Sequence, residues 1–154
     1  MPRVIGNGEV RIVWATTVTP SAPTAAEIGA GTVITPFVSS IDTPLDGDAP
    51  DASDLSSAFN KTVAGKFGGN VNATMYRDDT TDTAYDLFPR GTTGYLVIRR
   101  FGGSSAAIVA TDEVEVWNLR VITRSDQTLD DGSVQMFTVN FAAIDEPSID
   151  VAVV

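Results

Sequence analysis

The side chains that could do chemistry in this sequence are mostly carboxylates. The candidates for paired acid–base work are the adjacent pairs Asp78-Asp79 and Asp130-Asp131, and Glu113 with Glu115 two positions apart. A general acid and a general base must converge across a cleft, whereas sequence neighbours on a strand or in a turn diverge. Glu113 and Glu115 fall on one face of a predicted strand and are more simply interpreted as polar side chains on the surface of a sheet. We therefore expect no enzymatic activity and no catalytic residue.

The residue types that usually hold transition metals are missing. The 154-residue chain contains no Cys and no His, which excludes disulfide frameworks, thiolate sites, imidazole bases and most zinc, iron or copper sites. Asp46-Gly-Asp48 invites a calcium interpretation, but the spaced oxygens and closing Glu of an EF-hand loop are absent. Gly68-Gly69 is followed by neither Lys-Ser/Thr nor a helix, so it is not a phosphate loop. We expect no cofactor and no metal.

The charge is strongly acidic and unevenly placed. The net charge is −10, and residues 12–60 contain six acidic residues but no Lys or Arg. Such a surface repels nucleic acid and anionic membranes within a Debye length of about 8–10 Å. Arg99-Arg100 is too small a basic patch to reverse this. Two interpretations stay open: simple solubility, or an acidic surface that faces DNA without holding it.

No apolar run approaches the roughly 20 residues that a membrane helix needs. The first eight residues also lack the apolar region of a signal peptide. We expect a protein made in a cytoplasm, with no membrane partner, and with a length that fits a single domain over residues 1–154.

The strongest structural signal is a pair of alternating runs near the C-terminus. Glu113–Thr123 and Val134–Ile144 show period two with β-branched and aromatic residues, and Phe137, Val139 and Phe141 fall on one face. Asp131-Gly132 between the runs is a turn dipeptide. We predict an antiparallel hairpin that forms the core of the sheet.

Further strands are predicted over Glu9–Val18, Thr32–Val38 (interrupted by Pro36), Lys61–Arg77 and Tyr95–Phe101, with a possible repair strand over Ala106–Ala110. Within Lys61–Arg77, the Gly68-Gly69 pair leaves open either a hairpin turn or one long strand with a bulge, and the clean alternation that follows favours the bulge.

Helical signals are few. Asp79–Phe88 is the one good helix, with Asp79 as its N-cap, Asp82 in its first turn and Pro89 as its stop. Thr24 and Glu27 have the spacing of a capping box, which would open a second, very short helix.

Residues 39–60 are predicted to form a long acidic arm. Five aspartates stand there with two prolines and a glycine, and only three large aliphatic residues are present, so the segment cannot bury enough apolar area to order alone. A solvated or partner-docked arm is favoured. The predicted contact residues are Asp42, Leu45, Asp46, Gly47, Asp48, Asp51, Asp54 and Leu55. Residues 145–154 form a C-terminal extension whose apolar end, Val151–Val154, is expected to join a sheet or a neighbouring molecule.

Several stretches, taken in order, resemble the major tail tube protein of long-tailed bacteriophages. They are Ala22–Thr32, the acidic arm, Lys66–Asn70, Met75–Asp79, Asp82–Phe88, Gly91–Arg99 and a closing strand pair that ends near Ile144. The resemblance implies a mainly β fold: an antiparallel β-sandwich or half-barrel with one short flanking α-helix and a long acidic loop.

The same resemblance implies a structural subunit of the virion tail. Six copies would close a ring, rings would stack into a tube through which DNA passes, and other tail proteins would bind the tube ends. An acidic channel wall would let DNA slide because it does not adhere, and Glu113 and Glu115 are our predicted channel-facing residues. Two alternatives stay open. One is a related terminator or injection-system tube; the other is a monomeric β-sandwich binding module, although Trp14 and Trp117 are better interpreted as core or interface residues than as ligand stackers.

Overall fold

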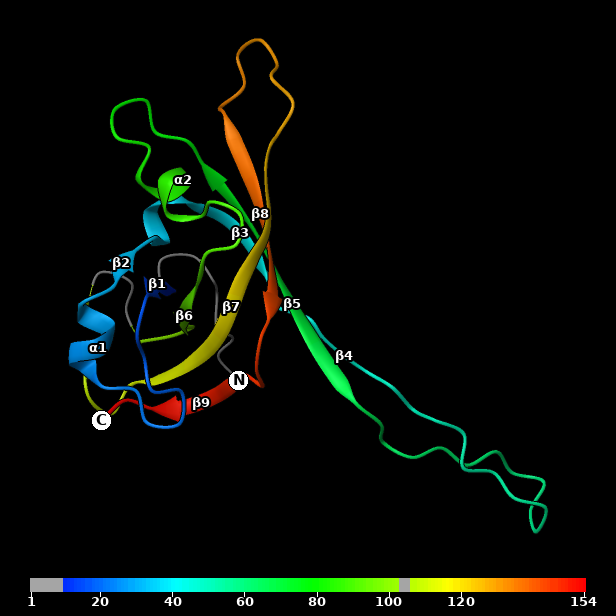
Figure 1. Cartoon of the computed structure of the whole chain (residues 1–154). Helices are drawn as coiled ribbons and strands as arrows, with labels where there is room; N and C mark the ends of the chain where they lie inside the picture. The colour runs from blue at the N-terminus through cyan, green and yellow to red at the C-terminus, as the bar shows by residue number, and fades with distance from the viewer. Residues whose placement is uncertain (1–9, 103–105) are drawn as a thin grey trace, which may run out of the picture.

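The computed structural model describes residues 10–102 and 106–154, and its architecture is one curled antiparallel sheet with two short helices (Figure 1). The strand order is β2-β1-β6-β7-β8-β5-β3, with β4 added to β5 and β9 added to β7. The strands are β1 (Arg11–Ala15), β2 (Thr32–Val33), β3 (Val38–Asp42), β4 (Leu45–Gly47), β5 (Phe67–Tyr76), β6 (Thr93–Arg99), β7 (Glu113–Asp126), β8 (Met136–Ala143) and β9 (Ser148–Ala152). The helices are α1 (Ala25–Gly29) and α2 (Thr83–Leu87), with a 3₁₀ turn over Thr35–Phe37. The predicted mainly β class is confirmed.

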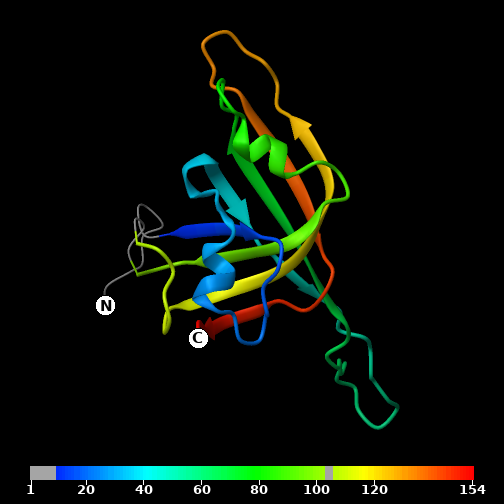
Figure 2. The same ribbon diagram turned by 60° about the vertical axis from the view of Figure 1, so that its left-hand side comes forward.

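The predicted hairpin is the centre of this sheet. β7 pairs with β8 from Leu119 opposite Ala143 to Asp126 opposite Phe137, and Gly132 in the link has a φ of 78°, which glycine adopts without strain. On its other edge β7 pairs with β6. Because β7 is 14 residues long, it joins the β1–β6 half of the sheet to the β8–β5–β3 half. Figure 2 shows the two halves crossing at β7.

The concave side of the sheet encloses the main core. Trp14 and Trp117 are only 4% and 1% exposed, which confirms their interpretation as core residues. The ring of Phe88, just after α2, meets Trp14 edge-on at 5.0 Å and Phe141 at 5.3 Å between centroids. Phe137, Val139 and Phe141 share this face, as their spacing predicted.

A second core lies on the opposite face of β1, β6 and β7. It contains Val13, Val97 and Val116, and Ile28 from α1 and Val153 from the C-terminal end cover it. The C-terminal extension therefore joins the protein's own sheet, through β9 on β7. This second cover is confined to one half of the sheet.

The two helices begin in different ways. In α1, Thr24 and Glu27 form the predicted capping box. In α2, the prediction that Asp79 is the N-cap is wrong, because the helix starts at Thr83 and Asp82 occupies the cap position. Asp82 has a φ of 48°, and its carboxylate accepts hydrogen bonds from Arg77 and from the Asp78 backbone N–H instead of capping the helix.

The boundaries of the arm are also different. Ser39–Asp42, predicted as part of the arm, belong to β3, and Ser40, Ile41 and Asp42 pair with β5. Lys61–Lys66, predicted as part of a strand, form the return leg of the arm, so β5 begins at Phe67. The preference for one long strand is confirmed, since Gly68 and Gly69 pair in register with β4. The predicted position of the bulge is wrong. In the pairing of β3 with β5, the register shift lies in β3, between Val38 and Ser40.

Two other predicted elements have different bounds or no strand in the structure. Ala106–Ala110 forms no strand, although Ile108 is buried in the second core. The first strand begins at Arg11, and the predicted start of this strand, Glu9, lies outside the described residues.

Candidate assembly surfaces

The arm is a two-stranded ribbon that leaves the body of the protein. Asp48 and Gly65 are joined by a 2.8 Å bond from the Gly65 N–H to the Asp48 carbonyl, and further backbone bonds link Val63 to Pro50 and Ala52 to Lys61. Figure 1 shows the ribbon extending away from the sheet, and Figure 2 shows the same from a second direction. The arm is thus more regular than the sequence suggested. Its backbone is satisfied by its own two legs, while its side chains remain exposed.

The predicted arm residues divide into two groups. Asp42 lies at the end of β3, and Leu45, Asp46 and Gly47 form β4, so these four residues hold the base of the arm against β5. The remaining four lie beyond that base, on the ribbon itself. They are Asp48, Asp51, Asp54 and Leu55, all of them exposed.

The tip of the arm combines apolar and acidic side chains. Leu55 is fully exposed and Phe59 is 75% exposed, which is unusual for large apolar residues outside an interface. Asp54 pairs with Lys61 at 3.0 Å, and hydrogen bonds from the Ser56 hydroxyl, from Lys61 and from the Ser56 N–H lower the pKa of its carboxyl. The pKa of Asp51 is lowered by hydrogen bonds from Ser53. These carboxylates stay charged well into acidic solution.

Glu113 and Glu115 do not form a matched acidic pair. Glu113 is exposed, whereas Glu115 is only 8% exposed and accepts two hydrogen bonds from Arg100, at 2.7 and 3.0 Å. The Arg100–Glu115 pair raises the pKa of the Arg100 guanidinium. That this face lines a channel stays a prediction, but the carboxylate of Glu115 is already neutralised by its partner.

A broad surface with few charges lies on the uncovered side of the β7–β8–β5–β3 half, and we call it the polar sheet face. The strand register aligns its side chains in two rows. They are Asp42, Asn72, Asn140 and Thr123 in one row, and Ser40, Thr74, Thr138 and Ser125 in the other. All of these residues are exposed or half-buried, and the Asn140 amide donates to Thr123 at 2.9 Å across the strands. Asp42 carries the one charge in these rows.

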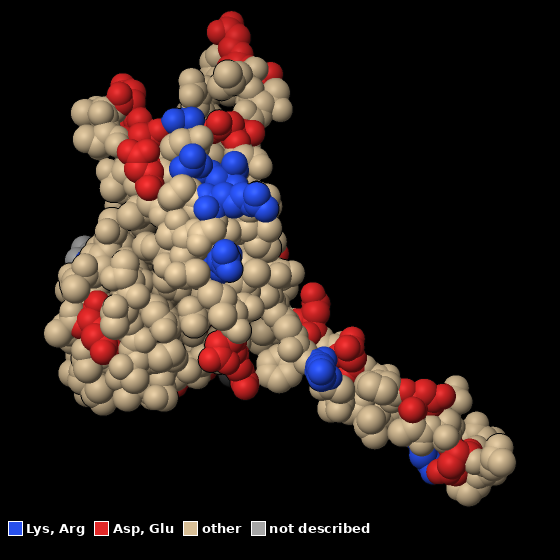
Figure 3. Space-filling view, in the orientation of Figure 1, with Lys and Arg blue, Asp and Glu red and all other residues tan. Residues whose placement is uncertain are grey.

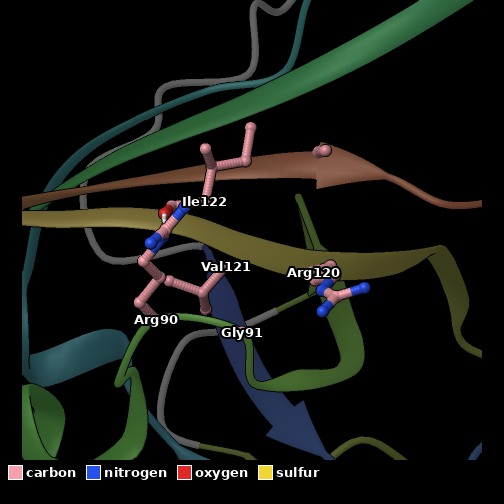
Figure 4. Close-up of a pocket in the computed structure, with 6 residues that line it drawn as sticks. Arg90, Gly91, Arg120, Val121 and Ile122 are labelled. Carbon is pink, nitrogen blue, oxygen red and sulfur yellow. Dashed lines mark hydrogen bonds between the residues drawn. The ribbon is translucent and has the colours of Figure 1, made fainter.

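At the β7 border of the polar sheet face lies a hollow of about 430 Å³ that sequence reasoning missed. Its lining residues are Arg90, Gly91, Arg120, Val121, Ile122 and Ala142. Figure 4 shows the two arginines on either side of Val121, Arg90 from the segment after α2 and Arg120 from β7. We call this hollow the arginine groove. Its floor includes Ile122, which is 45% exposed.

The groove arginines have fewer partners than most other described arginines. Arg124 donates to the Tyr85 carbonyl at 2.8 Å and stacks on the Tyr85 ring. Arg77 pairs with Asp82 and Asp126, and Arg99 and Arg100 each pair with a carboxylate. Arg90 donates only its Nε–H, to the Ile122 carbonyl at 3.2 Å, and among residues 10–102 and 106–154 neither Arg90 nor Arg120 meets a carboxylate. Figure 3 shows Lys and Arg side chains gathered over the part of β7 near α2, and acidic side chains along the arm.

Arg99-Arg100, interpreted from the sequence as too small a basic patch to hold nucleic acid, is also neutralised, because each arginine pairs with a carboxylate. Arg99 is 2% exposed and binds Asp112 at 3.0 Å together with the carbonyls of Ala106 and Ala107. A usable signal for the groove was the position of Arg120, which stands between two buried apolar residues, Leu119 and Val121, and therefore points to the opposite face of β7. No sequence signal connects it with Arg90.

Within the described parts of the chain, no group of three or more acidic side chains is arranged to hold a metal ion. None of the helices there has the length and apolar character needed to cross a membrane.

Solved structures with the same fold come from tubes and their ends. The tail of an empty gene transfer agent particle, refined with C6 symmetry, matches with 12% identity over 92% of this chain and 93% of that one, with a TM-score of 0.58. The SPP1 tail tube matches with 12% identity over 96% and 80%, with a TM-score of 0.61. The tube-terminating cap of the anti-feeding prophage matches with 12% identity over 99% and 94%, with a TM-score of 0.65.

No curated protein matches the chain. The sequence profile of the family described as "Phage tail tube protein", however, matches residues 1–154, the whole chain. The chain therefore belongs to the phage tail tube protein family and is a structural subunit of the virion tail.

Proposed function

We propose that six copies of this chain close into a ring, that rings stack into a tube, and that DNA passes through the tube. The arm is the observation that carries this proposal. A ribbon that exposes Leu55 and Phe59 and leaves its own body has a use only when a second molecule covers it. A contact between the arm and a different surface of the next copy is heterologous, so it repeats and builds a ring or a filament.

Open sheet edges support the ring. β3 pairs with β5 on one side, and its other edge has no strand partner among the described residues. An exposed edge invites pairing with another chain, and a closed barrel of several copies removes it. The sixfold number is supported by the C6 symmetry of the gene transfer agent tail, which has the same fold.

For the channel wall we propose the polar sheet face rather than the face of Glu113 and Glu115. Its two rows offer hydroxyl and amide groups that hydrogen-bond to water, and they carry only one charge, on Asp42. Such a wall neither holds nor strongly repels phosphates, while the net charge of −10 on each copy keeps the potential of the whole tube negative. The role is structural and needs no catalytic residue.

Other tail proteins would close the ends of the tube. The fold also occurs in the structures of the sheath/tube terminator of an extracellular contractile injection system and of the tube-terminating cap of the anti-feeding prophage. This supports an end protein that joins the same surfaces as another copy of the chain.

Negative-stain electron microscopy of the concentrated protein, with sedimentation across a concentration series, tests the proposal. We expect hollow fibres whose amount rises with concentration and which need no ligand. Single rings that do not stack would indicate a terminator instead. A monomer at every concentration would contradict the proposal and favour a binding module.

A further inference from the structure

The arginine groove poses an electrostatic problem in a tube that DNA must traverse. Arg90 and Arg120 stand at the border of the polar sheet face, and neither meets a carboxylate within the described chain. Guanidinium groups bind phosphate with two parallel hydrogen bonds. Two uncovered guanidiniums beside the channel wall would retain the DNA backbone, so a non-adhesive tube requires something to neutralise them.

The arm has the complementary chemistry. Between residues 43 and 66 it carries four aspartates and two lysines. Only Asp54 pairs with a lysine, so Asp46, Asp48 and Asp51 have no cationic partner among the described residues. The exposed Leu55 and Phe59 match the exposed Ile122 on the groove floor.

The arm of the same molecule is held away from the groove. Its two legs are hydrogen-bonded to each other from Asp48–Lys66 to Ala52–Lys61, and the ribbon leaves the body in both views (Figures 1 and 2). In the proposed assembly, the arm of a second copy can reach the groove instead.

We propose that the arginine groove is the receptor for the acidic arm of a second copy. The arm aspartates contact Arg90 and Arg120, and the apolar tip of the arm packs on Ile122. This inference rests on the proposed function and deepens it, since it names the surface that receives the arm. It also explains how an assembly with a smooth channel can contain the two groove arginines of each subunit, which meet no carboxylate within the described chain.

A charge exchange tests the inference. The groove variant carries Arg90→Glu and Arg120→Glu, and the arm variant carries Asp48→Lys and Asp51→Lys; all four positions are exposed, so both proteins are expected to fold with unchanged circular dichroism and melting temperature. Each variant alone opposes like charges. Its critical concentration for tube formation should rise at least about tenfold, the change that 1.4 kcal/mol produces.

Mixing the two variants restores opposite charges at every contact, as does a single chain with all four substitutions. Both should form tubes near the wild-type concentration. Asp130→Lys with Asp131→Lys is the matched control, because it changes the net charge as much as the arm variant does but at exposed sites outside the arm; it should assemble normally.

The outcomes separate the two proposals. If the wild-type protein forms no tubes, the proposed function fails. If wild-type tubes form and the groove variant assembles equally well, the inference is overturned while the proposed function stands. If the groove variant assembles normally but loses retention of a double-stranded oligonucleotide that the wild type shows, the groove is a DNA contact and the inference is again overturned.

Discussion

The guanidinium of Arg100 holds the carboxylate of Glu115 with two hydrogen bonds, from Nε to Oε1 at 2.7 Å and from the second amino group to Oε2 at 3.0 Å. Arg100 follows β6 and Glu115 lies on β7, so the pair joins two neighbouring strands at the edge of the main core. Glu115 also lies 3.5 Å from the indole nitrogen of Trp117. Glu115, which the sequence presents as a free surface carboxylate, therefore stabilises the sheet by linking β7 to the end of β6.

Glu115→Gln should therefore destabilise the fold. The amide keeps the shape but removes the charge-assisted bonds, and we expect a loss of about 1–2 kcal/mol, at the low end because Arg100 is half exposed. Urea unfolding measures the effect. Glu113→Gln is the control, and its exposed side chain predicts a change within about 0.5 kcal/mol. Equal effects of both variants would contradict the structural role of the pair.

Gly94→Ala should disturb the main core more strongly. A Cβ at Gly94 would lie 2.5 Å from Cζ2 of Trp14 and 2.8 Å from Cε2, and the buried indole cannot move without displacing Phe88 and Phe141. Overpacking of this kind costs about 1–3 kcal/mol. Gly68→Ala is the matched strand control, because a Cβ there meets nothing within 4 Å. Thermal unfolding of the two variants should differ clearly, and similar melting temperatures would argue against the close packing of Gly94 on Trp14.

Stability should fall in acid, in part through Asp112. A hydrogen bond from the Val109 N–H, with the neighbouring Arg99, lowers the pKa of this carboxyl below its ordinary value of 3.8. The folded state then binds the proton less tightly than the unfolded state. The stabilisation is fully present above pH 3.8 and is lost as pH falls through the lower folded pKa.

Asp112→Asn should accordingly be less stable than the wild type at neutral pH and should lose less stability on acidification. Urea midpoints measured from pH 7 to pH 2 give both quantities. Asp130→Asn, on the exposed β7–β8 link, serves as the control and should follow the wild-type curve. A pH profile of Asp112→Asn parallel to the wild type would refute the assignment.

Removal of the arm should separate folding from assembly. Deleting Asp42–Asp54 would also remove β4 and the end of β3. A narrower change replaces residues 49–64 by Asn-Gly. This dipeptide suits a two-residue turn between Asp48 and Gly65, which are already joined by a backbone hydrogen bond. We expect an unchanged melting temperature, because the exposed ribbon contributes little to the core, and a soluble protein that no longer forms tubes. Sedimentation and negative-stain microscopy measure tube formation. Normal tubes from the shortened chain would show that assembly does not need the arm.

The sequence by itself determined much of the sheet. Alternation placed Phe137, Val139 and Phe141 on one buried face, because side chains on a strand point to opposite sides in turn. The Thr24–Glu27 spacing determined a capping box, since both hydrogen bonds close within one helical turn. The arm was also evident, because a segment with so few apolar residues cannot join a core. These features depend on residues close together in the chain.

The tertiary structure decided which distant residues meet. Alternation puts Glu113 and Glu115 on one face but does not reveal that Arg100, just after the neighbouring strand β6, neutralises only Glu115. Likewise Arg90 and Arg120 are 30 positions apart, and only the β6–β7 register brings them to one groove. Cross-strand neighbours are set by register, and register follows from how both cores pack at once. For that reason the sequence alone determined the strands, the capping box and the arm, whereas the tertiary structure decided which residues lie together on the surfaces available to other copies.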